Sequence, residues 1–165
     1  MFARPFIDSL DFARNGGKIS GEAPVAELPR LLDVLDNPQG VLSYAVHGGL
    51  DKYGNPFLDV SIAGNCQLRC QRCLNAMDYQ VRLVARLILR DQTELDALDD
   101  DEDECDSILA EARLDVMNLL EEEILLSLPI APMHDSAVCQ AADGESAPGK
   151  AKNPFAALAK LKMVK

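Results

Sequence analysis

Tryptophan is absent from this 165-residue chain, aromatic residues make up only 5% of it, and there are two histidines. With so few rings, the core must be built from Leu, Val, Ile and Ala. The chain also lacks a Gly-x-Ser-x-Gly segment and a glycine-rich loop that could cradle a phosphate. His47 lies in a strand-like run beside Gly48-Gly49, where a histidine more often serves the structure than acts as a base. These absences indicate a binding protein and not an enzyme.

No apolar run approaches the length of about 20 residues that spans a bilayer. Residues 1–5 lead into a charged stretch without the apolar region of a secretory signal. We therefore expect a cytoplasmic protein with no membrane association and no small-molecule substrate. The length suits one domain of ordinary size with additional tails.

The chain is strongly acidic: it contains 27 acidic and 16 basic residues, which gives a net charge of −11. Such a chain repels an extended phosphate backbone unless its basic residues are segregated, so a basic protein is an easier partner. The five cysteines are an odd number in a chain without a secretory signal. They favour free thiols, metal ligation or redox chemistry over a disulfide framework.

Apolar residues alternate along three successive segments, which predicts three long strands. These segments are residues 41–50, 57–68 and 79–89. Short links between consecutive strands favour an antiparallel meander over a parallel sheet. A shorter strand is expected at residues 18–22, and residues 1–15 are predicted to be extended with an Asp-rich turn.

In two further segments the apolar residues recur at the spacing of a helix. Leucines predict a short helix near residues 28–35, where Pro29 fits only the first turn. Asp115 is a good N-cap for a longer helix over residues 116–127, whose apolar side would pack on the sheet. The three glutamates at 121–123 are expected mostly to face water. The predicted fold is therefore α+β, with an antiparallel β-meander and a long packed helix near the C-terminal end of the body.

Residues 94–106 contain nine acidic side chains. Charges of one sign at this density repel one another and predict a solvated, mobile loop. Docking of a basic partner is the functional interpretation of the same segment. Cys105 lies inside it and is not expected to be a ligand.

The composition changes after residue 139. Residues 140–152 are rich in Ala, Gly, Ser and Pro, which predicts a flexible linker after a single domain at 1–139. Residues 153–165 predict a short basic helix, and from Lys150 onwards there are five lysines and no acidic residue. A helix this short is marginal in water, so it should fold only against a partner. The residues expected to dock are Asn153, Pro154, Phe155, Leu158, Lys160, Leu161 and Lys162.

The segment Cys70-Gln71-Arg72-Cys73 lies between two predicted strands, where a hairpin turn can present both sulfurs to one point. This is the geometry of half a tetrahedral zinc site. His134 and Cys139 qualify as the other half, because both follow the long helix in a Pro-bounded loop. The sequence thus predicts a structural zinc site of these four residues. His134 is its least typical ligand, because His-x4-Cys is not the usual tight pair.

Two alternatives use the same residues without a zinc ion. In the first, Cys70 and Cys73 are small, partly buried thiols and His134 is an ordinary loop residue. In the second, the protein is a thiol redox protein in which Arg69 and Arg72 lower the thiol pKa of the Cys70/Cys73 pair. Thioredoxin-like pairs, however, begin a helix after a strand of a βα unit, and this pair lies between antiparallel strands.

A third alternative adds Cys66 to the pair. Cys66-x3-Cys70-x2-Cys73 has the spacing by which radical S-adenosylmethionine enzymes hold an iron–sulfur cluster. Those enzymes resemble partial α/β barrels and need a longer chain with repeated βα units. A short meander with one long helix does not supply that context.

Four blocks of the sequence together resemble the YceD family, whose members are described as large ribosomal RNA subunit accumulation proteins. The blocks are residues 70–73, residues 119–129, residues 132–136 with Cys139, and residues 153–162. Their order and spacing match over essentially the whole chain. Cys66 is an addition to the family pattern, which argues separately against a three-cysteine cluster.

The resemblance implies a role in the synthesis, processing or stability of large-subunit (23S) rRNA during ribosome biogenesis, without an established catalytic mechanism. The partner it implies is large-subunit rRNA or a pre-ribosomal particle. Combined with the charge pattern, it leads us to expect that the acidic surface meets basic ribosomal proteins. The lysine-bearing tail would dock on rRNA or in a protein groove.

Overall fold

The computed structural model describes residues 4–98, 106–135 and 138–139. The predicted linker at 140–152, the tail at 153–165 and most of the acidic segment lie outside these residues. A five-stranded sheet forms the centre of the fold, with the strand order β2-β3-β4-β5-β6. Its strands are β2 (Lys18–Pro24), β3 (Val41–Leu50), β4 (Pro56–Arg69), β5 (Ala76–Arg90) and β6 (Asp106–Leu109).

Strands β3, β4 and β5 form the predicted antiparallel meander, and β2 extends it by pairing antiparallel with β3. The pairing of β4 with β5 is continuous from Phe57 opposite Ile88 to Arg69 opposite Ala76. The fold class is α+β, as predicted. The sequence pattern did not predict β6, which runs parallel to β5 and pairs only with residues 87–90.

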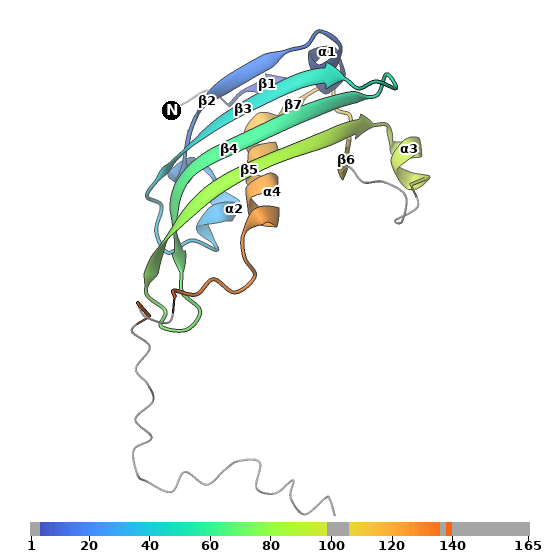
Figure 1. Ribbon diagram of the computed structural model, residues 1–165. Helices are drawn as coiled ribbons and strands as arrows, with labels where there is room; N and C mark the ends of the chain where they lie inside the picture. The colour runs from blue at the N-terminus through green and yellow to red at the C-terminus, as the bar shows by residue number, and fades with distance from the viewer. Residues whose placement is uncertain (1–3, 99–105, 136–137, 140–165) are drawn as a thin grey trace, which may run out of the picture.

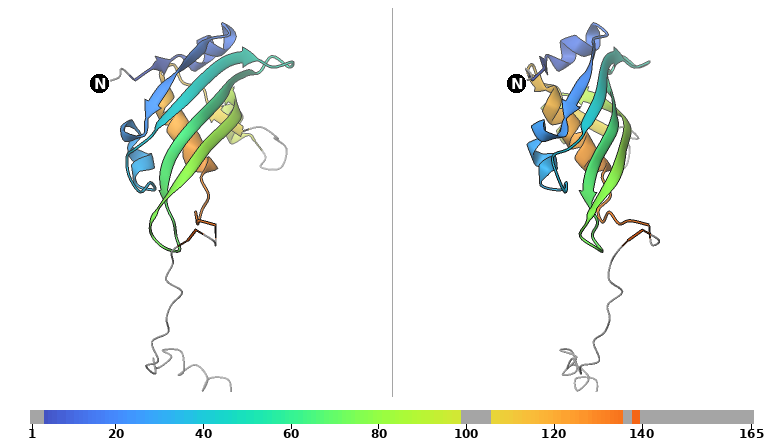
Figure 2. Two further views of the ribbon diagram at one scale, coloured as in Figure 1. Left: turned by 60° about the vertical axis from the view of Figure 1, so that its left-hand side comes forward. Right: turned by 90° about the vertical axis from the view of Figure 1, so that its left-hand side faces the viewer.

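Helix α4 (Val116–Ser127) packs across one face of the sheet, as Figures 1 and 2 show. The side chain of Asp115 accepts hydrogen bonds from the amides of Met117 and Asn118, which confirms the predicted N-cap. Between helix and sheet lies one hydrophobic core, which includes Leu58 and Val60 of β4 and Leu120 and Ile124 of α4. No helix of the described chain covers the opposite face (Figure 2).

The prediction that residues 121–123 mostly face water is wrong for two of the three glutamates. Glu121 is 1% exposed and Glu123 is 8% exposed. Oε1 of Glu121 accepts hydrogen bonds from the backbone amides of Arg30 and Leu31, at 2.6 and 3.0 Å. These amides begin α2 (Pro29–Leu32), and its own N-cap residue makes no side-chain cap bond. Glu121 is therefore buried because it caps a helix distant in sequence.

The N-terminal segment is not simply extended. It contains β1 (Phe6–Ile7) and α1 (Ser9–Arg14), and β1 pairs with β7 (Leu114–Asp115). Asp8 caps α1 through the amide of Asp11. A Cβ at Gly48 would lie 2.6 Å from the carbonyl oxygen of Phe12, so glycine at this position permits the close packing of α1 on β3.

Two short helices complete the described elements. One of them, at residues 92–96, lies where the acidic segment was predicted to be a mobile loop. The segment Val25–Glu27 forms the 3₁₀ helix η1. Helix α3 (Gln92–Asp96) occupies the start of the acidic segment, where Asp91 and Glu94 form a capping box. Local capping thus outweighs charge repulsion at residues 92–96. None of the helices in the described residues is long and apolar enough to cross a membrane.

Candidate metal centre

The turn between β4 and β5 positions the two cysteines of the Cys-x2-Cys segment. Cys70 directly follows β4, and its amide donates to the carbonyl of Asn75 at 3.0 Å, just before β5. The amide of Leu74 donates to the carbonyl of Cys70 at 2.9 Å, and Leu74 has a left-handed φ of 61°. These bonds close a tight knuckle that carries both sulfurs on one side.

The loop after α4 brings the second pair of residues to this knuckle. The backbone amide of Gln71 donates to the carbonyl of Pro132 at 2.8 Å, which fixes the loop against the turn two residues before His134. The amides of Val138 and Cys139 both donate to the carbonyl of Asp135, at 2.9 and 3.1 Å. Two segments more than 60 residues apart therefore meet at the end of the long β4–β5 hairpin.

The structure brings together all four residues that the sequence singled out. One ligand atom each from Cys70, Cys73, His134 and Cys139 lies within 4.8 Å of the other three. The sulfurs of Cys70 and Cys139 are 3.8 Å apart, and Sγ of Cys73 is 3.4 Å from Nδ1 of His134. In a tetrahedral zinc site two sulfurs lie about 3.8 Å apart, and a sulfur and a nitrogen about 3.6 Å apart. Both distances suit a shared four-coordinate ion.

Backbone groups around the four residues hold the ligand atoms in place. The amide of Arg72 donates to Sγ of Cys70 at 3.4 Å. Nε2 of His134 lies 3.1 Å from the carbonyl oxygen of Ala76, and a carbonyl can only accept, so Nε2 carries the proton. The lone pair of Nδ1 is then left facing Cys73. This is the orientation that histidine ligands of zinc obtain from their outer hydrogen bonds.

The thiols differ in acidity. Burial raises the pKa of the Cys70 thiol, but the backbone amides of Cys73, His134 and Arg72 outweigh it and lower the pKa to about 5. The amide of Asn75 lowers the pKa of Cys73, yet burial and the neighbouring Cys70 and Cys139 together raise it. Neighbouring thiols therefore hinder one another's ionisation, because thiolates this close repel. A bound cation would offset that repulsion.

Cys66 does not belong to the cluster. It lies in β4 opposite Tyr79, is 3% exposed in the hydrophobic core, and its pKa is raised by burial. The structure therefore argues against the three-cysteine iron–sulfur alternative. Cys105 lies outside the described residues.

The redox alternative also meets two difficulties. Cys70 has no exposed surface, whereas reactive thiolates are partly exposed. The lowering of its pKa comes from backbone amides and not from the Arg69 and Arg72 guanidinium groups that sequence reasoning invoked. These amides and the Ala76 carbonyl could not be predicted from residue types, because main-chain donors and acceptors are the same in almost every residue. The predicted docking residues, Asn153 to Lys162, lie outside the described residues.

Comparison with known proteins gives matches over much of the chain. A family model described as "Large ribosomal RNA subunit accumulation protein YceD" matches residues 58–162. A Haemophilus influenzae protein of the same name is 30% identical over an alignment of 173 positions, which covers 94% of each chain. No solved structure matches significantly.

Proposed function

The chain belongs to the YceD family of large ribosomal RNA subunit accumulation proteins, and from this membership we propose that it is a non-catalytic ribosome-biogenesis factor. In this role it supports the synthesis, processing or stability of 23S rRNA in the cytoplasm. The observation that carries the proposal is the match to a relative of that name over 94% of both chains.

The four-residue cluster is the structural zinc site of this factor. Cys70 and Cys73 from the β4–β5 turn, with His134 and Cys139 from the loop after α4, hold the ion. What supports this role is that two distances between ligand atoms are close to those of a tetrahedral zinc site and that the residues come from two distant segments. A site closed by four protein ligands serves structure and leaves no open position for a substrate.

Residues 1–139 act as one domain, followed by a flexible linker at 140–152 and a basic docking tail at 153–165. A single hydrophobic core that includes Ala13 and Ile124 supports one domain over the described residues. The acidic body meets basic ribosomal proteins. The tail, with Phe155, Leu158 and Leu161 on one side, docks in the pre-ribosomal particle.

Co-sedimentation with large-subunit precursors tests the proposed function. The full chain should sediment with precursor particles, and removal of residues 153–165 should abolish this. A variant with Phe155, Leu158 and Leu161 all changed to Ala should behave like the truncation, because docking needs the apolar side. Sedimentation unchanged in both variants would count against the tail as the docking element, and no sedimentation of the full chain would count against the proposed role.

Metal analysis of protein purified under reducing conditions tests the zinc site. We expect about one zinc per chain, lost in Cys73→Ser and retained in Cys66→Ala, the matched cysteine outside the cluster. Absence of stoichiometric zinc, together with folding unaffected by chelator, would remove the metal from the proposal.

A further inference from the structure

An apolar groove lies next to the four-residue cluster, where the end of α4, the segment after α2 and the β4–β5 turn meet. Its volume of about 440 Å³ is in the range of ligand sites in proteins. Leu35 and Leu68 line it as buried residues, at 7% and 2% exposure. The other apolar residues that line it are Val34, Leu125, Leu128, Pro129, Ile130 and Pro132.

Backbone contacts hold the sides of this groove together. Leu35 and Leu68 form an isolated antiparallel bridge, and next to it the amide of Asp36 donates to the carbonyl of Gln67 at 2.8 Å. At the cluster, residues 71 and 132 line the groove and are joined by the hydrogen bond described above. Figures 1 and 2 show α2 and α4 side by side on the same face of the sheet. A ligand would therefore meet a preformed site.

Large apolar side chains at this end of the molecule are exposed to solvent. Ile130 is fully exposed and Val34 is 46% exposed, although both line the groove. Leu74 of the β4–β5 turn, and Met133 and Val138 of the loop after α4, are exposed as well. Apolar residues gathered in this way mark an interaction surface.

The chain leaves the described body beside this groove. The sulfur of Cys139, the last described residue, is 3.8 Å from that of Cys70, whose neighbour Gln71 lines the groove. The 13 positions of residues 140–152 separate Cys139 from the tail. A flexible chain of that length spans about 20 Å on average. The tail therefore begins within reach of the groove.

The tail carries side chains that suit an apolar groove. Three large apolar residues recur at a spacing of three, which places them on one side of a helix: Phe155, Leu158 and Leu161. A helix as short as residues 153–162 gains its stability from packing of such a side and not from its own hydrogen bonds. The groove offers the apolar surface that this packing requires.

The charges at the groove also suit the tail. Asp33 lines the groove and is exposed. Arg69 is the basic residue of the lining, and Asp36 holds it in an ion pair at 3.2 Å. The lining thus presents an accessible carboxylate, while its one cation is already neutralised. The lysines of the tail, Lys160 and Lys162 among them, are attracted to such a surface.

We propose that residues 153–162 dock as a short helix in this groove of their own chain, with Phe155, Leu158 and Leu161 against Val34 and Ile130. This is helix-in-groove recognition within one molecule. A linker of this length gives the tail an effective concentration on the order of 1 mM, so even a Kd of about 0.1 mM fills about nine-tenths of the grooves. Any other site for the tail, including one in a pre-ribosomal particle, must displace it from the groove.

Two other occupants fit these observations less well. A helix of a separate partner has no tether, so it needs a much lower Kd to reach the same occupancy. The tail of a second copy has the same side chains but is present only at the concentration of the protein. The tethered tail has the advantage over both at micromolar protein.

The inference does not depend on the proposed ribosomal role, because the isolated full-length protein is sufficient for its test. NMR of the isoleucine and valine methyl groups in dilute protein detects docking directly. The ring of Phe155 should show nuclear Overhauser contacts with the methyl groups of Val34 and Ile130 and should shift their resonances. Phe155→Leu keeps an apolar side chain and should remove the ring-dependent shifts. The methyl groups of Val84, exposed on the open face of the sheet, should not respond.

A free peptide with the sequence of residues 150–165 measures how fully the groove is occupied. A variant with Phe155, Leu158 and Leu161 all changed to Ala leaves the groove empty. The peptide should bind this variant about tenfold more tightly than the unsubstituted chain, in which the tethered tail competes for the site.

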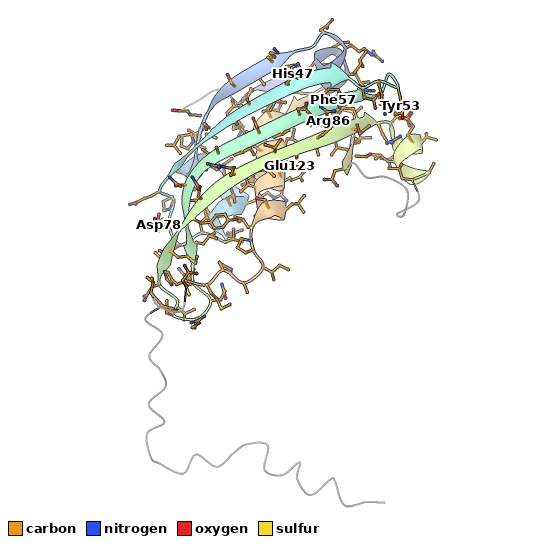
Figure 3. All side chains as sticks on the ribbon, in the orientation of Figure 1. His47, Tyr53, Phe57, Asp78, Arg86 and Glu123 are labelled. Atoms are coloured by element: carbon orange, nitrogen blue, oxygen red, sulfur yellow. The ribbon has the colours of Figure 1, made fainter. Side chains whose placement is uncertain are left out.

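Substitutions in the body of that triple variant locate the binding site. Adding Val34→Ser and Ile130→Ser should abolish peptide binding, and both positions are exposed, so the fold should be retained. The matched control is Tyr53→Ser, another exposed residue. Figure 3 shows Tyr53 at one end of the sheet and Asp78 towards the other, where the groove lies. The control should change the Kd by less than about twofold.

Three outcomes would overturn the proposal. Equal affinity of the peptide for the unsubstituted chain and the triple variant would mean that the tail does not occupy the groove. Failure of the peptide to bind the triple variant would assign the groove to another occupant. Methyl shifts that grow with protein concentration, together with a dimer in sedimentation, would assign it to the tail of a second copy.

Discussion

At the scale of single residues, two buried glutamates two positions apart on α4 have opposite effects. Glu121 accepts two backbone hydrogen bonds at the start of α2. Glu123 has no such donor among the described residues. The Glu121 carboxylate therefore stabilises the folded state through its hydrogen bonds. The Glu123 carboxylate instead costs free energy, which the rest of the fold offsets.

Removing the Glu121 carboxylate should destabilise the protein substantially. Glu121→Ala leaves the amides of Arg30 and Leu31 without their acceptor, and a loss of about 2–4 kcal/mol in the free energy of unfolding is expected. Urea denaturation measures it. Glu121→Gln retains an acceptor oxygen and should lose less. Glu122→Ala, an exposed site on the same helix, should change stability by less than about 0.5 kcal/mol. Equal losses in the two alanine variants would show that the capping bonds contribute nothing.

Substitution of Glu123 should stabilise the protein in a pH-dependent way. Burial, and then the charges of Asp106 and Glu122, raise the pKa of this carboxyl above its ordinary value. The folded state thus binds the proton more tightly than the unfolded state, and stability falls as pH rises through the interval between the two pKa values. Glu123→Gln should therefore have a higher Tm than the unsubstituted protein at pH 7. The difference should disappear below about pH 4.3, the ordinary glutamate pKa.

Thermal denaturation by circular dichroism from pH 4 to 8 checks this expectation. A Tm difference that is constant with pH would mean that the charge of Glu123 is not the cause.

At the scale of elements, the β4–β5 turn and the loop after α4 depend on each other. The bond from Gln71 to Pro132, the four clustered side chains and the contact of His134 with the Ala76 carbonyl join them. Chelation of the proposed zinc should therefore release this loop while the sheet stays folded. Hydrogen exchange should become faster at the Gln71 amide and remain slow at Val46, which is 1% exposed in β3. Readdition of zinc should restore the protection, and unchanged exchange at Gln71 would mean that other contacts hold the loop.

The long strands and α4 were predictable because their signals are local. Period-two alternation located β3 at its observed bounds, and Asp115 marked the start of α4. The short strands β1, β6 and β7 carry too few residues for such a pattern, so long-range pairing defines them. The burial of Glu121 was missed for the same reason, since its donors lie about 90 residues away in sequence.

The candidate site could be predicted more fully than its surroundings. The spacing of Cys70 and Cys73 in a turn, joined with His134 and Cys139 after the helix, identified the four residues that the structure brings together. The supporting amides and the Ala76 carbonyl could not be predicted, because any residue type supplies them.

At the scale of the whole molecule, the net charge of −11 should limit direct contact with RNA. The basic tail offers five lysines from Lys150 onwards, which can neutralise only a few phosphates. Binding to naked 23S rRNA should be weak, and log K should fall against log salt with a slope between about −3 and −5. Filter binding at several salt concentrations measures the slope. Tight binding that is insensitive to salt would contradict the expectation of an acidic body that meets basic proteins.

The distance in sequence between the two halves of the proposed metal centre has a consequence for folding. Cys70 and Cys139 are 69 positions apart, so an ion bound by both closes a loop through nearly half of the chain. A cross-link of that span restricts the denatured ensemble by about 4 kcal/mol in the chain-entropy approximation. Because so large a loop closes slowly, the centre should assemble after the meander has formed. The availability of zinc would then mainly affect how slowly the native chain unfolds, and it would have little effect on the folding rate.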